Sequence, residues 1–241
     1  MIQMNLTGLL HQSHSRKLRS SGGGLAEQKL GELNMRVLVA CEESQAVTKE
    51  FRALGHEAYS CDIQPCSGGH PEWHLNVDAL ELLKMEWDLV IAHPPCTYLT
   101  AASAVRLFNS DHSIKNSERY AQGLQAAEFF RAFLNSDCPR VCIENPVPLK
   151  IWNLPKYTQV VEPFQFGDPW RKRTCLWLRG LPDLVPSEIV QPLGLWVGAT
   201  SSRRDGSVYS RYSLRSKRSQ IERSKTFPGI AKAMAAQWGS L

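Results

Sequence analysis

The stretch MRVLVACEESQAVTKEFRALGHEAYSCDI, residues 35–63, decides the fold of this chain. Residues 35–40 are mostly apolar, which is typical of a short buried strand. In residues 44–54 the apolar side chains recur at helical spacing, and Gly55 follows as a helix stop. Residues 57–63 read as a second strand. The stretch therefore predicts a strand–helix–strand unit.

The same alternation continues along the chain. Helices are expected over residues 79–85 and 117–134, and strands over residues 87–92, 139–143 and 174–178. Strands that alternate with helices predict a Rossmann-like α/β fold, with a mostly parallel sheet and helices on both faces. Ligands of such sheets bind beyond the carboxyl ends of the strands. The residues that directly follow each strand are therefore the candidates for a site.

Length and composition limit the possible architectures. The chain has 241 residues, which suits one α/β domain with a small appendage. We expect the domain to occupy residues 35–241. We expect residues 1–34 to form a flexible extension, because residues 20–24 have the Ser/Gly composition of a linker. The apolar runs are too short for a bilayer, which needs about 20 such residues, so no membrane span is expected.

Charge and cysteine content indicate the compartment and the partners. The net charge of +5 permits binding to nucleic acid without requiring it. The chain has seven cysteines, no pair spaced as C-x-x-C and no recognisable export signal. We therefore expect free thiols in a reducing cytoplasm. No metal site is expected, because the spacing of cysteines and histidines matches no common zinc module.

Polar residues follow the first strands of the expected sheet. Cys41, Glu42 and Ser44 lie between the first strand and its helix, where nucleotide-like ligands bind, although the loop lacks glycines. Asp62 follows the second strand and suits a ribose-hydroxyl acceptor. It could equally be a solvated acid. Asp78 suits an acceptor for an amino group, or an N-cap of the next helix.

The tetrapeptide His93-Pro94-Pro95-Cys96 follows the third strand. Two prolines fix the backbone of a turn, so Cys96 is presented beyond the strand end. A thiol is a strong covalent nucleophile. The alternative is a small buried apolar residue, which we expect for the other six cysteines. Glu144 and Asn145 follow the strand over residues 139–143, and Glu144 would face Cys96 if the two strands are neighbours; the alternative is a turn residue.

These motifs occur in the order found in the DNA cytosine-5 methyltransferase family, and the chain resembles compact phage or prophage members. Cys96 matches the catalytic Pro-Cys of the family, and Glu144 with Asn145 matches its Glu-Asn pair. Residues 170–173 resemble its Gln-Arg-x-Arg segment, in which Arg173 is the better counterpart and Arg171 the second. The resemblance covers about residues 35–180 and 226–239, including a C-terminal helix beside the cofactor.

The resemblance implies S-adenosylmethionine as the cofactor and cytosine C5 of DNA as the methyl acceptor. It implies that Cys96 forms a covalent adduct, that Glu144 holds the base and that Arg173 stabilises developing charge. The implied cofactor contacts are Cys41, Glu42, Ser44, Asp62, Ile63, Asp78 and Pro94. The chain departs from the family where Cys41-Glu42-Glu43-Ser44-Gln45 replaces a Phe-x-Gly-x-Gly loop.

A second departure is the short segment over residues 181–225, where the family has a full target-recognition domain. The segment is basic, and its predicted nucleic-acid contacts are Arg203, Arg204, Arg211, Arg215, Lys217 and Arg218. The alternative is a solvated loop. Contacts to phosphates carry little sequence information, so we expect short or relaxed specificity.

Three alternative functions remain open at this point. An amino methyltransferase acting on adenine N6 or cytosine N4 would need an aromatic residue after the prolines, and Tyr98 is close to that position. The acceptor could instead be RNA or a free nucleotide. The third alternative is a non-catalytic DNA-binding protein with a decayed methyltransferase fold. For all of them we expect a monomer in the cytoplasm of a bacterial host, encoded by a phage or prophage, with restriction–modification as one biological setting.

Overall fold

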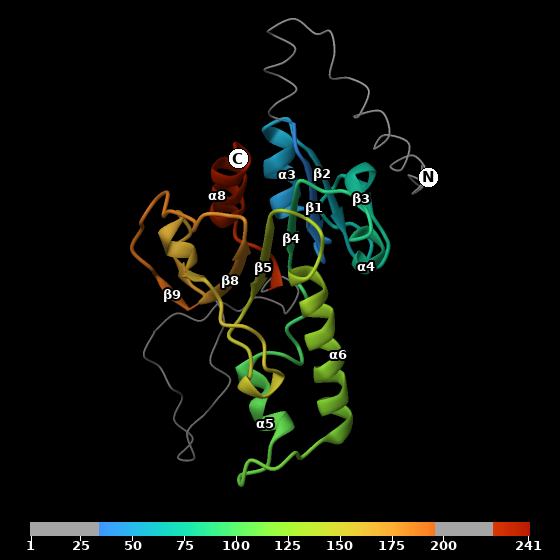
Figure 1. Ribbon diagram of the computed structural model, residues 1–241. Helices are drawn as coiled ribbons and strands as arrows, with labels where there is room; N and C mark the ends of the chain where they lie inside the picture. The colour runs from blue at the N-terminus through green and yellow to red at the C-terminus, as the bar shows by residue number, and fades with distance from the viewer. Residues whose placement is uncertain (1–33, 196–223) are drawn as a thin grey trace, which may run out of the picture.

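The computed structural model describes residues 34–195 and 224–241 (Figure 1). Its strands are β1 (Arg36–Ala40), β2 (Glu57–Cys61), β3 (His74–Leu75), β4 (Leu89–Ala92), β5 (Val141–Asn145), β6 (Gln159–Val161), β7 (Trp170–Arg171), β8 (Thr174–Arg179) and β9 (Gly194–Leu195). Its α-helices are α3 (Ala46–Ala53), α4 (Ala79–Leu82), α5 (Ala104–Leu107), α6 (Ser117–Leu134) and α8 (Pro228–Trp238). Single 3₁₀ turns are η1 (Pro71–Trp73), η2 (Ala101–Ser103), η3 (Lys150–Trp152) and η4 (Pro163–Gln165).

Seven strands form one sheet in the order β3-β2-β1-β4-β5-β8-β6. All neighbours pair in parallel except β8, which is antiparallel to both β5 and β6. The strand order reverses between β1 and β4, because the chain builds outward to β3 and then returns to the other side of β1. Open α/β sheets bind ligands at the carboxyl ends of the strands beside such a reversal. The predicted Rossmann-like fold is confirmed.

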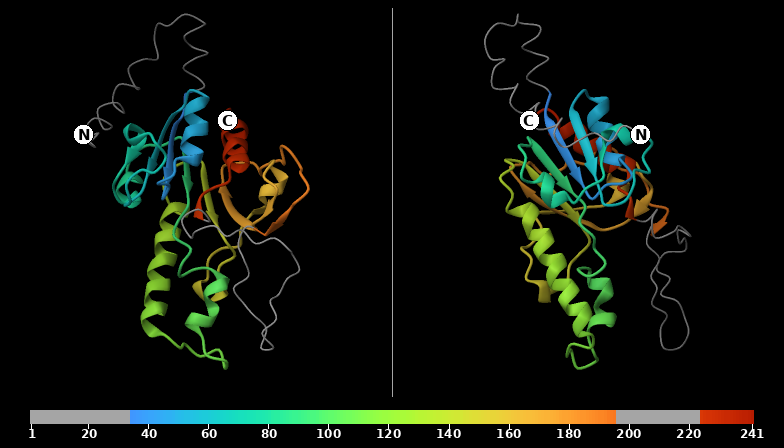
Figure 2. Two further views of the ribbon diagram at one scale, coloured as in Figure 1. Left: turned by 180° about the vertical axis from the view of Figure 1, so that it is seen from behind. Right: turned by 90° about the vertical axis from the view of Figure 1, so that its right-hand side faces the viewer.

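Helices cover both faces of the sheet, which gives three layers (Figures 1 and 2). On one face α3 and α8 lie side by side, and Phe51 and Trp238 are fully buried there. On the other face α6 and α4 pack, with Phe130 and Leu82 fully buried. Burial of each such side chain stabilises the fold by about 1.5–3 kcal/mol.

Helix α6 has the bounds that the sequence predicts. The side chain of Asn116 caps its start by accepting a hydrogen bond from the Arg119 amide at 2.8 Å. Gly123 lets the helix approach Trp152, because a Cβ atom at this position would lie 2.1 Å from the indole ring. Beyond the carboxyl edge of the sheet, the first turns of α6 and the short α5 project as a lobe (Figures 1 and 2).

Two strands differ from the prediction in ways that affect the site. The strand expected over residues 139–143 is β5, which starts later because Pro139 has no amide hydrogen, and which includes Glu144 and Asn145. The strand expected over residues 174–178 extends to Arg179 and runs antiparallel to β5. Most other predicted elements are one to three residues longer than those observed.

The structure describes only parts of the expected extension and of the expected basic segment. Most of the extension, residues 1–33, lies outside the described residues, as do residues 196–223. The start of the expected basic segment packs onto the sheet domain, since Gln159 exchanges two hydrogen bonds with the backbone of Leu184. Within the described ranges, no helix has the length and apolarity needed to cross a membrane.

Candidate active site

The turn after β4 places Cys96 at the carboxyl edge of the sheet. Pro94 is buried, and its carbonyl accepts a hydrogen bond from the Asn145 side-chain amide at 2.7 Å. The carbonyl of Cys96 accepts hydrogen bonds from the amides of Leu99 and Thr100 at 3.1 and 3.0 Å. All seven cysteines lie in the described residues and are free, and Cys96 is the exposed one. The turn is therefore fixed while its thiol is accessible.

Glu144 lies beside the Cys96 turn because β4 and β5 are adjacent. In their register Ala92 pairs with Ile143, so the next residues, His93 and Glu144, are neighbours. The imidazole Nδ1 of His93 lies 2.9 Å from the Glu144 carboxylate, and each side chain is only 10% exposed. The expected proximity of Glu144 to Cys96 is supported by the effect of its charge on the thiol. His93 is a site residue that the sequence analysis did not single out.

The His93–Glu144 pair favours its charged forms. Burial raises the pKa of Glu144, but the hydrogen bond from His93, the charges of Lys172 and His93 and a hydrogen bond with Thr174 outweigh it, so the pKa is lowered. Burial likewise lowers the pKa of His93, but the hydrogen bond and charge of Glu144 and the charge of Glu42 leave it raised. At neutral pH Glu144 is therefore a carboxylate that accepts a hydrogen bond from the protonated Nδ1 of His93.

Glu42 has a structural role that the sequence did not predict. It is buried, and its carboxylate accepts hydrogen bonds from the Val47 amide at 2.6 Å and from the Thr48 amide and hydroxyl at 3.2 and 2.7 Å. It therefore caps the start of α3, while its predicted cofactor contact stays a prediction. Burial raises the pKa of Glu42, partly offset by the charge of His93.

Of the three basic residues before β8, Lys172 is the one that acts on the site. Its charge lowers the pKa of both Glu144 and Cys96. Arg171 instead lies 3.6 Å from Glu162, and the exposed Arg173 donates a hydrogen bond to the Tyr157 hydroxyl at 3.3 Å. The predicted catalytic roles of Arg173 and Arg171 stay predictions.

The surroundings of Cys96 disfavour its thiolate. Partial burial of the sulfur and the charge of Glu144 raise the pKa of the Cys96 thiol. The charge of Lys172 and a backbone hydrogen bond offset only part of this rise. Positive charge near a thiol favours its thiolate, and here the charge of Lys172 is present but outweighed. A reactive thiolate would therefore have to form as a substrate binds.

The predicted cofactor residues form a second cluster, at the ends of β1, β2 and β3. Burial raises the pKa of the Cys41 thiol, and the charges of Cys61, Asp62 and Asp78 raise it further, so both aspartates lie near this loop. Asp78 is also the N-cap of α4, since it accepts a hydrogen bond from the Leu80 amide at 2.9 Å. The N-cap interpretation of Asp78 is thus confirmed, and its role as an acceptor for an amino group stays a prediction.

The other predicted cofactor residues differ in exposure. Ile63, which follows Asp62 after β2, is 78% exposed, so a large apolar side chain is available to a ligand at the carboxyl edge of the sheet. Ser44 is half-buried, and its carbonyl lies against Gly68, where a Cβ atom would approach it to 2.5 Å. Gln45 ties the two loops, because its side chain accepts a hydrogen bond from the His70 amide at 3.1 Å and donates one to the His70 carbonyl at 2.8 Å. The β1–α3 loop has no glycine of its own, but Gly68, in the loop after β2, allows the two loops to pack closely.

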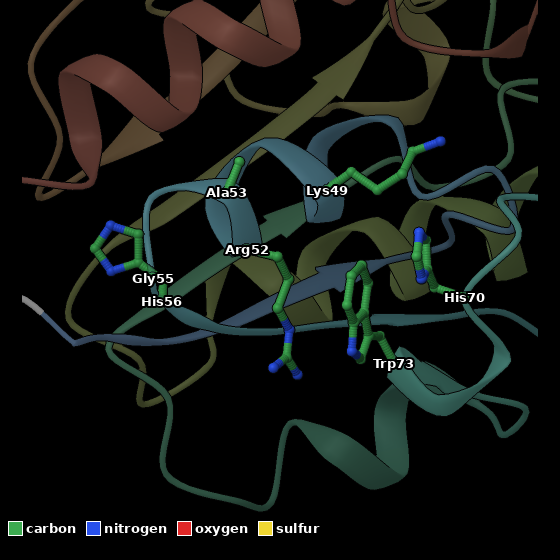
Figure 3. A pocket seen from close by; sticks show the side chains of 7 residues that line it. All are labelled: Lys49, Arg52, Ala53, Gly55, His56, His70 and Trp73. Carbon is green, nitrogen blue, oxygen red and sulfur yellow. The ribbon is translucent and has the colours of Figure 1, made fainter.

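The predicted nucleic-acid contacts, residues 203, 204, 211, 215, 217 and 218, lie outside the described residues. A separate basic hollow of about 480 Å³ lies beside α3, lined by Lys49, Arg52, Ala53, Gly55, His56, His70 and Trp73 (Figure 3). His70 stacks on Trp73 with 3.9 Å between ring centroids. The Lys49, Arg52 and His56 side chains point in different directions, so the hollow does not gather their charges on one point (Figure 3). It contains none of the predicted site residues.

Comparisons with known proteins add little to this geometry. No protein-family model matches the chain, and no curated protein matches it. Among solved structures, a methyltransferase from Entamoeba histolytica aligns with a TM-score of 0.43 and 13% sequence identity. The alignment covers 65% of this chain and 58% of that protein, so the chain spans less than two thirds of its length. The activity must therefore be inferred from the site itself.

Proposed function

We propose that this chain is a methyltransferase that transfers a methyl group from S-adenosylmethionine to C5 of cytosine in DNA. The observation that carries the proposal is the pairing of an exposed cysteine, Cys96, in the turn after β4, with a buried carboxylate, Glu144, on the adjacent strand β5, both at the carboxyl edge of the sheet. A thiol on a rigid turn suits a covalent nucleophile. A carboxylate beside it suits the polar edge of a base.

The chemistry assigns each group one task. Cytosine C5 is a weak nucleophile, and addition of the Cys96 sulfur to C6 makes C5 enamine-like and able to accept a methyl group. Glu144 contacts N3 and the amino group, which orients the ring. Lys172, rather than Arg173 or Arg171, stabilises the negative charge that develops on the base and thiolate. Loss of the C5 proton and of Cys96 then releases the product.

The cluster at the ends of β1, β2 and β3 fits the cofactor. S-adenosylmethionine supplies the electrophilic methyl group when it is bound. The carboxylates of Asp62 and Asp78 would accept hydrogen bonds from its ribose hydroxyls and its amino group. The exposed Ile63 would cover a face of its adenine ring. Cys41, Ser44 and Pro94 complete this surface, whereas Glu42 is committed to capping α3.

The acceptor must present an unstacked base. C6 of cytosine cannot reach Cys96 inside a duplex, so the base is flipped out or already single-stranded. Arg203, Arg204, Arg211, Arg215, Lys217 and Arg218 would neutralise backbone phosphates of the DNA. Phosphate contacts carry little sequence information, so the proposal includes a short or relaxed target sequence. A methylation map that shows one motif of six or more defined bases would contradict this part.

The amino-methyltransferase alternative has less support from the site. It would use an aromatic ring after the prolines to stack on the base, and Tyr98 is the nearest candidate. The ring of Tyr98 is half-buried and already faces the Arg119 guanidinium, whose carbon lies 4.8 Å from the ring centroid. The same guanidinium is held in place by a hydrogen bond to the Thr97 carbonyl at 2.6 Å.

Transfer of labelled methyl groups tests the proposal. The full chain is incubated with labelled S-adenosylmethionine and duplex DNA, single-stranded DNA or RNA, and the modified bases are identified by mass spectrometry. We expect 5-methylcytosine in DNA from the wild type, none from Cys96→Ser, and normal activity from the control Cys66→Ser. Label on an amino nitrogen or only in RNA would overturn the assignment. No label together with no cofactor binding in calorimetry would indicate a non-catalytic protein.

A further inference from the structure

The proposed reaction leaves His93 without a task, although its side chain is largely enclosed and lies beside Glu144. Its side chain is 10% exposed, and its Nδ1 lies 2.9 Å from the Glu144 carboxylate. Its other ring nitrogen, Nε2, is buried and has no hydrogen-bond partner among the described residues. Buried polar groups without partners are uncommon and call for an explanation, often a functional one.

Charged groups face His93 from three parts of the fold. Glu144 approaches from β5, Glu42 from the loop after β1, and Lys172 from the segment before β8. The two carboxylates favour a proton on the imidazole, and the lysine opposes it. The imidazole, whose side chain is only 10% exposed, therefore holds its proton between two acids.

The pair answers a difficulty in the proposed chemistry. Negative charge develops on the base ring as sulfur adds to C6, and a proton delivered to N3 relieves it. Glu144 is the group that reaches N3, but its lowered pKa leaves it without a proton at neutral pH. A carboxylate alone would repel the developing charge, so a proton must come from a neighbour.

We propose that His93 supplies this proton, passing it from Nδ1 through the Glu144 carboxyl group to N3 of the acceptor base. The inference rests on the proposed function and names a further residue for it. His93 acts through Glu144 and positions a proton; it does not itself touch the base. Histidine is suited to this task because its ordinary pKa, about 6.5, is the side-chain pKa nearest neutrality.

The proton and electron counts balance. The Cys96 thiolate forms a bond to C6. The C5–C6 π pair becomes a C4–C5 double bond, and the C4–N3 π pair becomes a lone pair on N3. N3 then takes a proton from Glu144 while Glu144 takes one from His93. The thiolate, imidazolium and carboxylate become a neutral adduct, a neutral imidazole and a carboxylate. After methylation, water removes the C5 proton, the C6–S bond breaks with its electron pair on sulfur, and the N3 proton returns through Glu144 to His93.

The first test needs no substrate. Histidine nuclear magnetic resonance measures the protonation of His93 against pH in the wild-type chain, with the signal assigned by its loss in His93→Gln. We expect the titration midpoint of His93 to lie above that of the ordinary imidazole and to fall in Glu144→Gln. A midpoint at or below the ordinary value in the wild type, or one that Glu144→Gln leaves unchanged, would overturn the proton-holding pair.

The second test follows the chemistry. Single-turnover methyl transfer to DNA is measured from pH 5.5 to 9 for the wild type, His93→Gln and His93→Asn, with thermal unfolding and cofactor calorimetry as controls for the fold. The ratio of the wild-type rate to the variant rate removes their shared dependence on the Cys96 thiolate, and it should fall as the pH rises through the titration of His93. Below that titration the variants should be slower by about 100-fold or more, with cofactor affinity unchanged.

The outcomes of the two tests separate this proposal from the proposed function. A wild type that transfers methyl groups, with variants of unchanged rate and pH profile, refutes the role of His93 alone. A wild type that transfers no methyl group refutes the proposed function and, with it, the step through N3. In that case the resonance experiment still decides whether His93 and Glu144 share a proton.

Discussion

Replacing Glu42 by alanine tests whether this carboxylate stabilises the fold or contacts a ligand. The substitution removes the acceptor for three hydrogen bonds at the start of α3, from the amide of Val47 and from the amide and hydroxyl of Thr48. Two buried amides and a hydroxyl are then left without a partner. Because these donors cannot reach water, we expect a loss of stability rather than a specific loss of ligand binding.

The size of the loss follows from the contacts. A hydrogen bond to a charged group contributes about 1.5–3 kcal/mol net, but burial of the carboxylate, which raises its pKa, offsets part of that gain. We expect Glu42→Ala to lower the free energy of unfolding by about 2–4 kcal/mol. For a chain of this size about 1 kcal/mol shifts Tm by about 2–4 °C, so Tm should fall by about 4–16 °C.

Urea unfolding followed by circular dichroism measures this loss, with Glu43→Ala as the matched control. Glu43 is the neighbouring, half-buried carboxylate, it does not cap α3, and its removal should cost about 0.5 kcal/mol or less. The raised folded pKa also fixes a sign: wild type should lose stability relative to Glu42→Gln as the pH rises above about 4.3. Unchanged stability of Glu42→Ala together with weaker S-adenosylmethionine binding would refute the capping role.

Three further predictions follow from the same contacts. Cys96 should be alkylated slowly by iodoacetamide at pH 7 and faster at higher pH, because its raised pKa keeps it a thiol; complete alkylation at pH 6, read by peptide mass spectrometry, would contradict this. Lys172→Met should slow that alkylation several-fold, and Arg171→Met should not; equal effects would mean that Lys172 is not the cation of the site. Gly123→Ala should cost about 1–3 kcal/mol, since its Cβ would lie 2.1 Å from the Trp152 ring, and an unchanged urea midpoint would show that the ring yields freely.

Much of the fold could be predicted from local patterns. Helix α6 matches its expected bounds because Asn116 is an effective cap and a turn, Asn135 to Ser136, follows its end. The strands β1 and β4 are short, mostly apolar runs, which is the pattern of buried parallel strands, and the neighbouring β2 has a mixed sequence. Their ends were predicted to within two residues, which was enough to point to Cys96 as the residue to examine.

The direction of β8 could not be predicted in the same way. An apolar run reads alike whether it pairs in parallel or antiparallel, and the choice is made by tertiary contacts. The register of β8 against β5 pairs Glu144 with Leu176 and Asn145 with Cys175. Glu144 and Asn145 are therefore strand residues that pair with β8, whereas the sequence analysis expected both to follow the strand, with a turn as the alternative for Glu144.

The roles of individual polar residues were the hardest to predict. Consecutive residues of an extended segment point to opposite sides, so Lys172 faces the site while Arg171 faces Glu162. The sequence offered only three basic residues in a row, with no local signal to select the middle one. Likewise, Glu42 precedes α3 by a few residues, a spacing that fits a cap as well as a ligand contact.

A covalent adduct on Cys96 is the most direct test of the central claim. A DNA strand that carries 5-fluorocytosine cannot lose a proton from C5, so the bond between sulfur and C6 should persist after methyl transfer. We predict a denaturation-resistant complex that forms only with S-adenosylmethionine present, with the methylated base attached to the Cys96 peptide in mass spectrometry. Label transferred to ordinary DNA without any trapped complex, or a complex attached to another residue, would contradict the assignment of Cys96 as the nucleophile.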